Sequence, residues 1–173
     1  LQTPAPDVQI AAAKAVGALG LKTAGKMLAE VVKNTQLTPG VRVESLRTLA
    51  SLKDAALADS ITFSQTDFSE ALRREANRLQ AQTKPAAALE SLISVLDHGS
   101  VFDRQGAFAA LATIEGSLAD EVLLQWLDKA TTGDIPKEIE LDLFEAAEQR
   151  TDARIKKSLD EIAVAGKSED PLA

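Results

Sequence analysis

Apolar residues recur along this chain at the spacing of amphipathic helices. In residues 39–54, PGVRVESLRTLASLKD, the side chains of Leu46, Leu49 and Leu52 step three apart behind a proline and a glycine. Steps of three and four residues place side chains on one face of a helix. The pattern therefore predicts helices that each turn an apolar face towards a neighbour.

The stretch at 39–54 is one of five related copies, and internal repetition of this kind defines the architecture. One apolar slot is occupied in chain order by Val16, Leu49, Leu79, Leu111 and Ala147, with separations of 33, 30, 32 and 36 residues. A second apolar periodic segment follows each copy, so each copy predicts a pair of helices. The five predicted pairs are residues 6–34, 39–63, 67–97, 100–130 and 135–165.

Turn and cap residues separate the predicted helices. Proline and glycine stand between the apolar runs, and Asp67, Ser100 and Ser117 are expected to cap helix N-termini. Connections this short make successive helices antiparallel neighbours. The sequence predicts an all-α fold of about ten antiparallel helices in one repeat domain at residues 1–166. Residues 167–173 are expected to form a polar tail or linker.

Two segments, PDVQIAAAKAVGALG (6–20) and PGVRVESLRTLASLK (39–53), resemble the second helix of a HEAT repeat. Arg42 matches that family's arginine after valine, and Arg104 occupies the same position in its copy. The remaining copies hold other residues there: Gln9, Leu72 and Glu140. These departures would break a ladder of Asp and Arg between repeats. The resemblance implies an α-α superhelix, in which stacked helix pairs share one continuous core.

A second resemblance concerns the end of the chain. An alanine-rich HEAT stretch followed by AGKSEDPLA (165–173) looks like the segment before a c-type cytochrome domain in bacterial multi-domain membrane-associated dehydrogenases. That resemblance implies a spacer between the redox domains of a larger chain. It also implies a periplasmic or otherwise extracytoplasmic location, which the sequence alone leaves undetermined.

Composition narrows the range of partners. Apolar residues make up 45% of the 173 residues, but aromatic residues only 3%, so the core is expected to be aliphatic. The formal net charge of −7 disfavours nucleic acid, whose phosphates attract Lys and Arg. We find no run of about 18 apolar residues, so direct membrane insertion is not expected. The absence of cysteine excludes disulfides, thiol nucleophiles and covalent c-type haem attachment within this chain.

The densest basic group is Arg73, Arg74 and Arg78, in ALRREANR at residues 71–78. Arginine forks bind carboxylates and phosphates, so these residues are candidates for contact with an anion or a partner. Glu70 and Glu75 lie at helical spacing from them and compete through local ion pairs.

Other polar and aromatic residues favour structural interpretations. The single histidine, His98, is expected at a helix end, and the acidic residues of KEIELDLFEAAE (137–148) are expected on a solvated helix face. Trp126 lies on an apolar stripe and is expected in the core. Gly17 and Gly106 stand inside predicted helices, where they either permit close helix crossings or are merely tolerated. No residue is expected to be catalytic, to hold a cofactor or to bind a metal ion.

Two classes of function fit these observations. The favoured one is a non-catalytic scaffold that binds a protein or neighbouring domains of the same chain, and the segment itself is then not an enzyme. The alternative is an enzyme on a HEAT-like fold, such as a bilin lyase. A DNA glycosylase fits less well, because it needs a basic groove with aromatic side chains that hold a flipped base.

Overall fold

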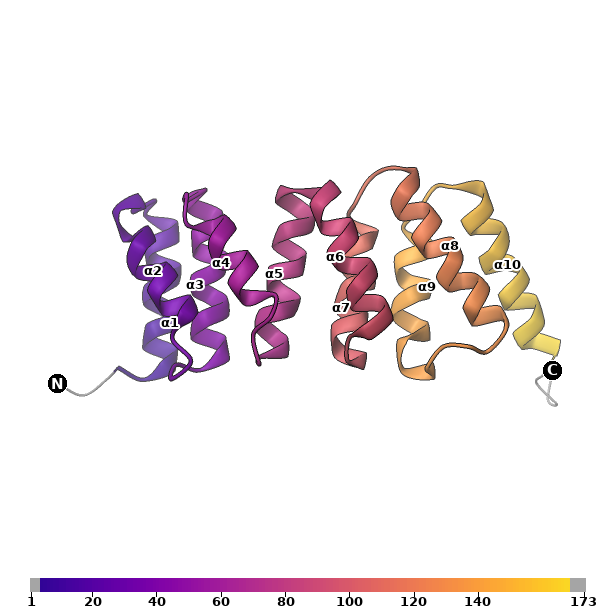
Figure 1. Cartoon of the computed structure of the whole chain (residues 1–173), viewed down its shortest axis with the longest axis horizontal. Helices are drawn as coiled ribbons and strands as arrows, with labels where there is room; N and C mark the ends of the chain where they lie inside the picture. The colour runs from indigo at the N-terminus through magenta and orange to yellow at the C-terminus, as the bar shows by residue number, and fades with distance from the viewer. Residues whose placement is uncertain (1–3, 169–173) are drawn as a thin grey trace. The chain divides into compact units, whose positions relative to one another are not determined.

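The computed structural model describes residues 4–168, with side chains described through residue 164. Within that range the chain forms ten α-helices and no strand, which confirms the all-α prediction (Figure 1). The helices are α1 (Pro6–Ala18), α2 (Gly25–Lys33), α3 (Pro39–Leu52), α4 (Leu57–Ser64), α5 (Glu70–Thr83), α6 (Pro85–His98), α7 (Val101–Ala112), α8 (Ser117–Thr131), α9 (Glu140–Glu148) and α10 (Ala153–Ser168). Short 3-10 helices, η1 (Lys22–Ala24) and η2 (Lys137–Ile139), precede α2 and α9.

The chain divides into two compact units, residues 1–80 (unit 1) and residues 81–173 (unit 2), with the division inside α5. In unit 1, α1 packs on α3 and α2 packs on α4. In unit 2, α7 packs on α9 and α8 packs on α10. Each unit therefore stacks alternate helices, as repeated helix pairs do. The limits of the predicted repeat domain and of its five pairs stay predictions.

Several helix starts have a proline, serine or glycine that favours the start of a helix. Proline occupies the first turn of α1, α3 and α6, where its missing N–H costs no hydrogen bond. Ser100 caps α7 by accepting the Asp103 amide at 3.2 Å, as predicted. Ser117 is instead the first residue of α8, behind Gly116 at φ 111°. Gly116 stands in a region that favours glycine, so it supplies the turn before the helix.

The expected cap at Asp67 is wrong. Ser69 immediately precedes α5, and its hydroxyl accepts a long, weak contact from the Leu72 amide at 3.4 Å. Asp67 is buried instead and pairs with Arg42. The predicted tail at residues 167–173 lies outside the described residues, except for Lys167 and Ser168 in α10.

The core of unit 1 is aliphatic and joins α1 to α5. Leu46, Leu49 and Leu72 in this core are completely buried. The cluster consists of Ala13, Leu28, Val32, Val43, Leu46, Leu49, Leu52, Ile61, Leu72, Ala76 and Leu79. Of the two interpretations of Gly17, the close crossing is the one observed, because a Cβ there would lie 3.1 Å from the Ser51 hydroxyl of α3.

The core of unit 2 adds aromatic rings to aliphatic side chains. The rings of Phe108 and Trp126 meet edge to face, with centroids 5.5 Å apart and planes at 82°. Trp126 is 7% exposed, which confirms its predicted place in the core. Around this pair lie completely buried side chains from α6 to α10: Leu92, Leu96, Leu111, Leu123, Leu127, Ile139, Leu143 and Ile155.

Candidate functional site

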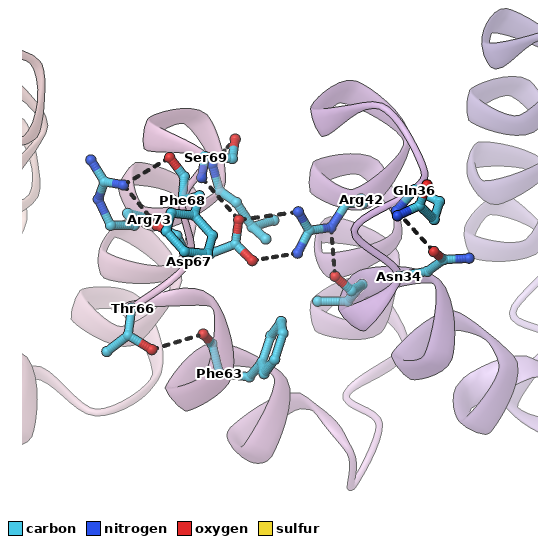
Figure 2. Close-up of polar contacts among 11 residues, drawn as sticks. Asn34, Gln36, Arg42, Phe63, Thr66, Asp67, Phe68, Ser69 and Arg73 are labelled. Atoms are coloured by element: carbon cyan, nitrogen blue, oxygen red, sulfur yellow. Dashed lines mark hydrogen bonds and ion pairs between the residues drawn. The ribbon is translucent and has the colours of Figure 1, made fainter.

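The strongest candidate for a functional surface is the connection between α4 and α5, residues 63–73, which we call the α4–α5 corner (Figure 2). Arg42 of α3 reaches this corner from inside unit 1. Its Nη1 donates to Asp67 Oδ1 at 3.1 Å, and its Nη2 donates to Asp67 Oδ2. Its Nε donates to the Val32 carbonyl, in the last turn of α2, at 2.8 Å. One buried guanidinium therefore joins α2, α3 and the corner.

The backbone of the corner is held from its other side as well. Asp67 Oδ1 accepts the Ser69 amide at 2.9 Å, which fixes a tight turn in front of α5. Arg73 Nη1 donates to the carbonyls of Asp67 at 2.7 Å and Phe68 at 3.2 Å. Figure 2 shows the two arginines approaching the segment from opposite sides. The corner is thus a rigid loop.

The Asp67 carboxylate is held in its charged form. Burial raises its pKa, but the hydrogen bonds from Arg42 and from the Ser69 amide outweigh this effect, so the pKa lies below its ordinary value. Glu75 of α5 behaves in the same way. Burial raises the pKa of Glu75, but the hydrogen bonds from Arg78 and Arg47 outweigh this effect, so its pKa also lies below its ordinary value. Both acids therefore stay ionised at neutral pH and keep their arginine partners.

Phe68 stands out on this rigid loop, because its side chain is 99% exposed. Phe63, at the end of α4, is 37% exposed, with Lys33 Nζ 6.0 Å from its ring centroid. Burying a phenylalanine is worth roughly 1.5–3 kcal/mol, so a fully exposed ring in a fixed position forgoes that gain. Sequence reasoning missed Phe68. The available signal was an aromatic residue between two helices, outside every repeat slot.

The predicted contact residues Arg73, Arg74 and Arg78 lie on α5 but do not form one site. Arg73 supports the α4–α5 corner and lies 3.8 Å from Glu70. Arg78 instead forms an ion pair with the buried Glu75, as the competing interpretation expected. Arg74 is exposed in the first half of α5. Contact of these arginines with an anion or partner stays a prediction.

One Asp–Arg pair does join two successive copies, although the sequence did not predict it. Arg42 pairs with Asp67 of the following copy, 25 residues later. Arg104, in the equivalent position, instead donates Nη2 to the Asp97 carbonyl at 2.9 Å. The arginine position is therefore used differently in the two units.

A second polar cluster surrounds Arg150 in unit 2. Its Nε donates to Asp120 Oδ1 at 2.6 Å, and its Nη1 donates to the Ile114 carbonyl at 2.7 Å. Further bonds at 3.3 Å reach the carbonyls of Ala112 and Gly116. Arg150 lines a surface hollow of about 430 Å³, but these bonds direct its guanidinium into the protein. We interpret the cluster as a structural brace for the end of α7.

The remaining candidates are structural as well. His98 is the last residue of α6, as predicted. In the acidic segment, Glu138, Glu145 and Glu148 are exposed, as on a solvated face, whereas Glu140 and Asp142 are half-buried. Over residues 4–168, His, Cys, Asp and Glu side chains form no group of three or more that could hold a metal ion. In the same range, every helix is too short or too polar to cross a bilayer.

Comparison with known proteins leaves the family open. None of the protein-family models matches the chain, and none of the curated proteins matches it either. We therefore infer the function from the geometry of the α4–α5 corner.

Proposed function

We propose that this chain is a non-catalytic scaffold of HEAT-like repeats that binds a protein through its α4–α5 corner. The observation that carries the proposal is Phe68, which is 99% exposed on a loop fixed by the Arg42–Asp67 pair and by Arg73. Aromatic residues in fixed positions are frequent anchors of protein interfaces. Because the loop is already ordered, binding loses little conformational entropy there.

The surroundings of Phe68 indicate the chemistry of its partner. The Phe68 ring is 99% exposed, and the neighbouring ring of Phe63 is 37% exposed. An apolar pocket would complement this surface. The partner is a separate protein or a neighbouring domain of the same chain.

A scaffold is preferred to a HEAT-like enzyme because of how the polar side chains are used. At the hollow around Arg150 and at the α4–α5 corner, arginine donors bond to the protein's own oxygens. An enzyme site would instead direct several polar groups into a pocket where a substrate fits. The corner offers a protruding aromatic ring, which suits binding.

The more specific part of the proposal is a spacer role within a larger dehydrogenase that carries a c-type cytochrome domain. The coding sequence on either side of this segment tests it. The expected result is a propeller-type domain on one side and a Cys-x-x-Cys-His haem motif on the other, with an extracytoplasmic location. A reading frame without such domains would contradict the spacer role and leave the scaffold proposal intact.

Site-specific photocrosslinking tests binding at the corner. Benzophenone-alanine replaces Phe68 in one preparation and Leu118, an equally apolar residue that is 69% exposed on α8, in the control. In cells that make the native protein, we expect one discrete protein adduct from position 68 alone. Excess unmodified chain should suppress the adduct, and excess Phe68→Ser chain should not. Equal adducts at both positions, or equal suppression by both chains, would refute the corner as a docking surface.

A further inference from the structure

The buried side of α4 carries two serines in positions where α2 carries large apolar residues. Ser60 and Ser64 are completely buried and lie one helical turn apart. The same four-residue step on the buried side of α2 holds Leu28 and Val32. Among the residues whose side chains are described, Ile61 is the one large apolar side chain that α4 buries, whereas α3 buries five. Apolar burial therefore holds α4 less firmly than α3.

The hydroxyls of these two serines also lack hydrogen bonds. Neither Ser60 Oγ nor Ser64 Oγ has a hydrogen-bond partner in the described part of the chain. By contrast, Ser45, which is buried on α3, donates its hydroxyl to the Val41 carbonyl at 2.9 Å. A buried hydroxyl without a partner forgoes the hydrogen bonds that it makes in water, so it opposes burial. Water regains access to both hydroxyls when α4 leaves its place in the core.

Two anchors on α3 fix the limits of the segment that can move. The Asp54 amide donates to the Leu49 carbonyl at 3.1 Å, so the chain is tied to α3 just before α4. Just after α4, the Asp67 carboxylate accepts two hydrogen bonds from Arg42 of α3 (Figure 2). Residues 55–66 lie between these anchors, and we call them the α4 segment. Because neither anchor involves a residue of the α4 segment, both can persist when that segment moves.

The polar contacts that hold the α4 segment are partly open to water. Gln65 Nε2 donates to Asn77 Oδ1 at 3.0 Å and to Gln80 Oε1 at 2.6 Å, which links the segment to α5. Gln65 is half-buried, so water can replace these hydrogen bonds when the segment leaves. Asp59, the single charged residue of the segment, is exposed on the outer side of α4. The contacts that keep the segment closed are therefore weaker than the buried ion pair beside it.

We propose that α4 opens as a unit: the α4 segment leaves α2 and α3, while α3 and residues 67–73 of the α4–α5 corner stay folded. Openings of this kind occur where few buried apolar contacts hold an element. Opening uncovers the part of the unit 1 core that Ile61 packs against, and it moves Phe63 while Phe68 keeps its support. The open form thus presents apolar surface that the closed form hides. Its effect on docking at the corner rests on the proposed function, whereas the opening itself does not.

Thiol labelling tests the opening, because the chain contains no cysteine and an introduced thiol is then its single one. Ser64→Cys places the thiol on the buried side of α4, and Ser45→Cys places it on the buried side of α3 as the matched control. Labelling rates of the folded full chain are divided by those of the same chain unfolded in urea. We expect position 64 to react at least about tenfold faster than position 45. Equal rates would show that α4 opens only when α3 does and would overturn the proposal.

A second substitution identifies the cause of the opening. In the Ser64→Cys chain, Ser60→Ala removes the remaining unpaired hydroxyl and should slow labelling about tenfold. Thr62→Ala is the control, because it gives a comparable gain in helix propensity but removes an exposed hydroxyl that donates to the Ala58 carbonyl at 3.2 Å. It should slow labelling by no more than about threefold. An effect of Thr62→Ala as large as that of Ser60→Ala would exclude the buried hydroxyls as the cause.

Hydrogen exchange of the unaltered chain gives the same comparison without a substitution. Amides of α4, corrected for their intrinsic rates, should exchange at least about tenfold faster than those of α3 and with a smaller dependence on urea, because less surface is exposed. Amides of α4 and α3 that share one rate and one urea dependence would overturn the proposal. A missing adduct from position 68 would contradict docking at the corner and would leave these rates unchanged.

Discussion

The two units of this molecule fill their interiors differently. Among the described residues, unit 1 buries eight polar or charged residues: Arg42, Ser45, Thr48, Ser60, Ser64, Asp67, Glu75 and Asn77. Unit 2 buries one, Asp103. Its space is filled instead by larger apolar groups, among them the Phe108–Trp126 pair. Helix pairs with similar sequence periodicity can therefore have interiors that contain many polar groups, as in unit 1, or interiors that are almost entirely apolar, as in unit 2.

Each unit also uses one arginine to close the end of a helix. Arg42 binds the Val32 carbonyl and Asp67, and both side chains of the ion pair are 4% exposed. Arg150 binds carbonyls behind α7 and Asp120, and the side chains of that pair are 10% and 15% exposed. The Arg42–Asp67 pair is the more buried of the two, so water is less able to hydrogen-bond to the side chain that is left when its partner is removed. Breaking it should therefore cost more than breaking the shallower one.

The largest effect is expected from Arg42→Met. It should lower the free energy of unfolding of unit 1 by about 3–5 kcal/mol, because Asp67 is left buried without its partner. Urea titration combined with hydrogen exchange of α3 amides measures the loss. Replacing both residues, Arg42→Met with Asp67→Leu, should recover part of it. If Arg42→Met lowered the free energy of unfolding by no more than Arg150→Met does, the expected difference between the two ion pairs would be contradicted.

A smaller effect is expected in the aromatic core of unit 2. Phe108→Leu should cost about 2 kcal/mol, because it removes the edge-to-face contact with Trp126 and leaves unfilled volume. The matched control is Phe68→Leu, the same exchange at a ring that is 99% exposed, where the cost should stay within about 0.5 kcal/mol. Hydrogen exchange of α8 amides distinguishes the two, and equal losses would show that the aromatic pair is not central to this core.

Arg150→Met should cost about 1–2 kcal/mol. Water can reach the carbonyls that Arg150 leaves, because its side chain lies near the surface. The loss should appear in the hydrogen exchange of residues 113–121, which comprise the turn after α7 and the start of α8, with little change in α3. If Arg150→Met lowered the free energy of unfolding as much as Arg42→Met does, the expected dependence on the burial of the ion pair would be wrong.

Acid should weaken unit 1 more than unit 2. Asp67 and Glu75 have pKa values below their unfolded values, so their stabilisation is present above a pH of about 4 and is lost as the pH falls through the folded pKa. Between about pH 7 and about pH 3, α3 amides should lose on the order of 1 kcal/mol more protection than α8 amides. In Asp67→Asn this difference should shrink. An unchanged difference would exclude Asp67 as its source.

The sequence predicted the helices well because the spacing of apolar residues that defines a helix is local in the chain. The slot that holds Leu49, Leu79, Leu111 and Ala147 is buried in each of these copies, since three- and four-residue spacing determines which face of a helix is covered. Proline and glycine likewise marked the helix ends. A small residue inside a helical pattern indicated a close approach at Gly17 only as one of two interpretations, and the structure shows that approach.

The sequence predicted the candidate site poorly because its contacts are tertiary. Asp67 meets an arginine 25 residues away, and nothing in TDFSE distinguishes that pairing from a helix cap. Phe68 looks like any apolar residue until its exposure is known. Thr48 lies outside the apolar slots of its helix, yet its hydroxyl donates to the Ala13 carbonyl of another helix. Burial of polar groups depends on which helices meet, and periodicity does not specify that.

The position of Trp126 has a consequence for spectroscopy. It is the single tryptophan of a chain that has no tyrosine, and it lies in the core of unit 2 beside Phe108, with Lys129 Nζ 4.1 Å from its ring centroid. Its intrinsic fluorescence therefore reports on unit 2, whereas far-ultraviolet circular dichroism reports on every helix. If the two signals change at different denaturant concentrations, the units melt separately.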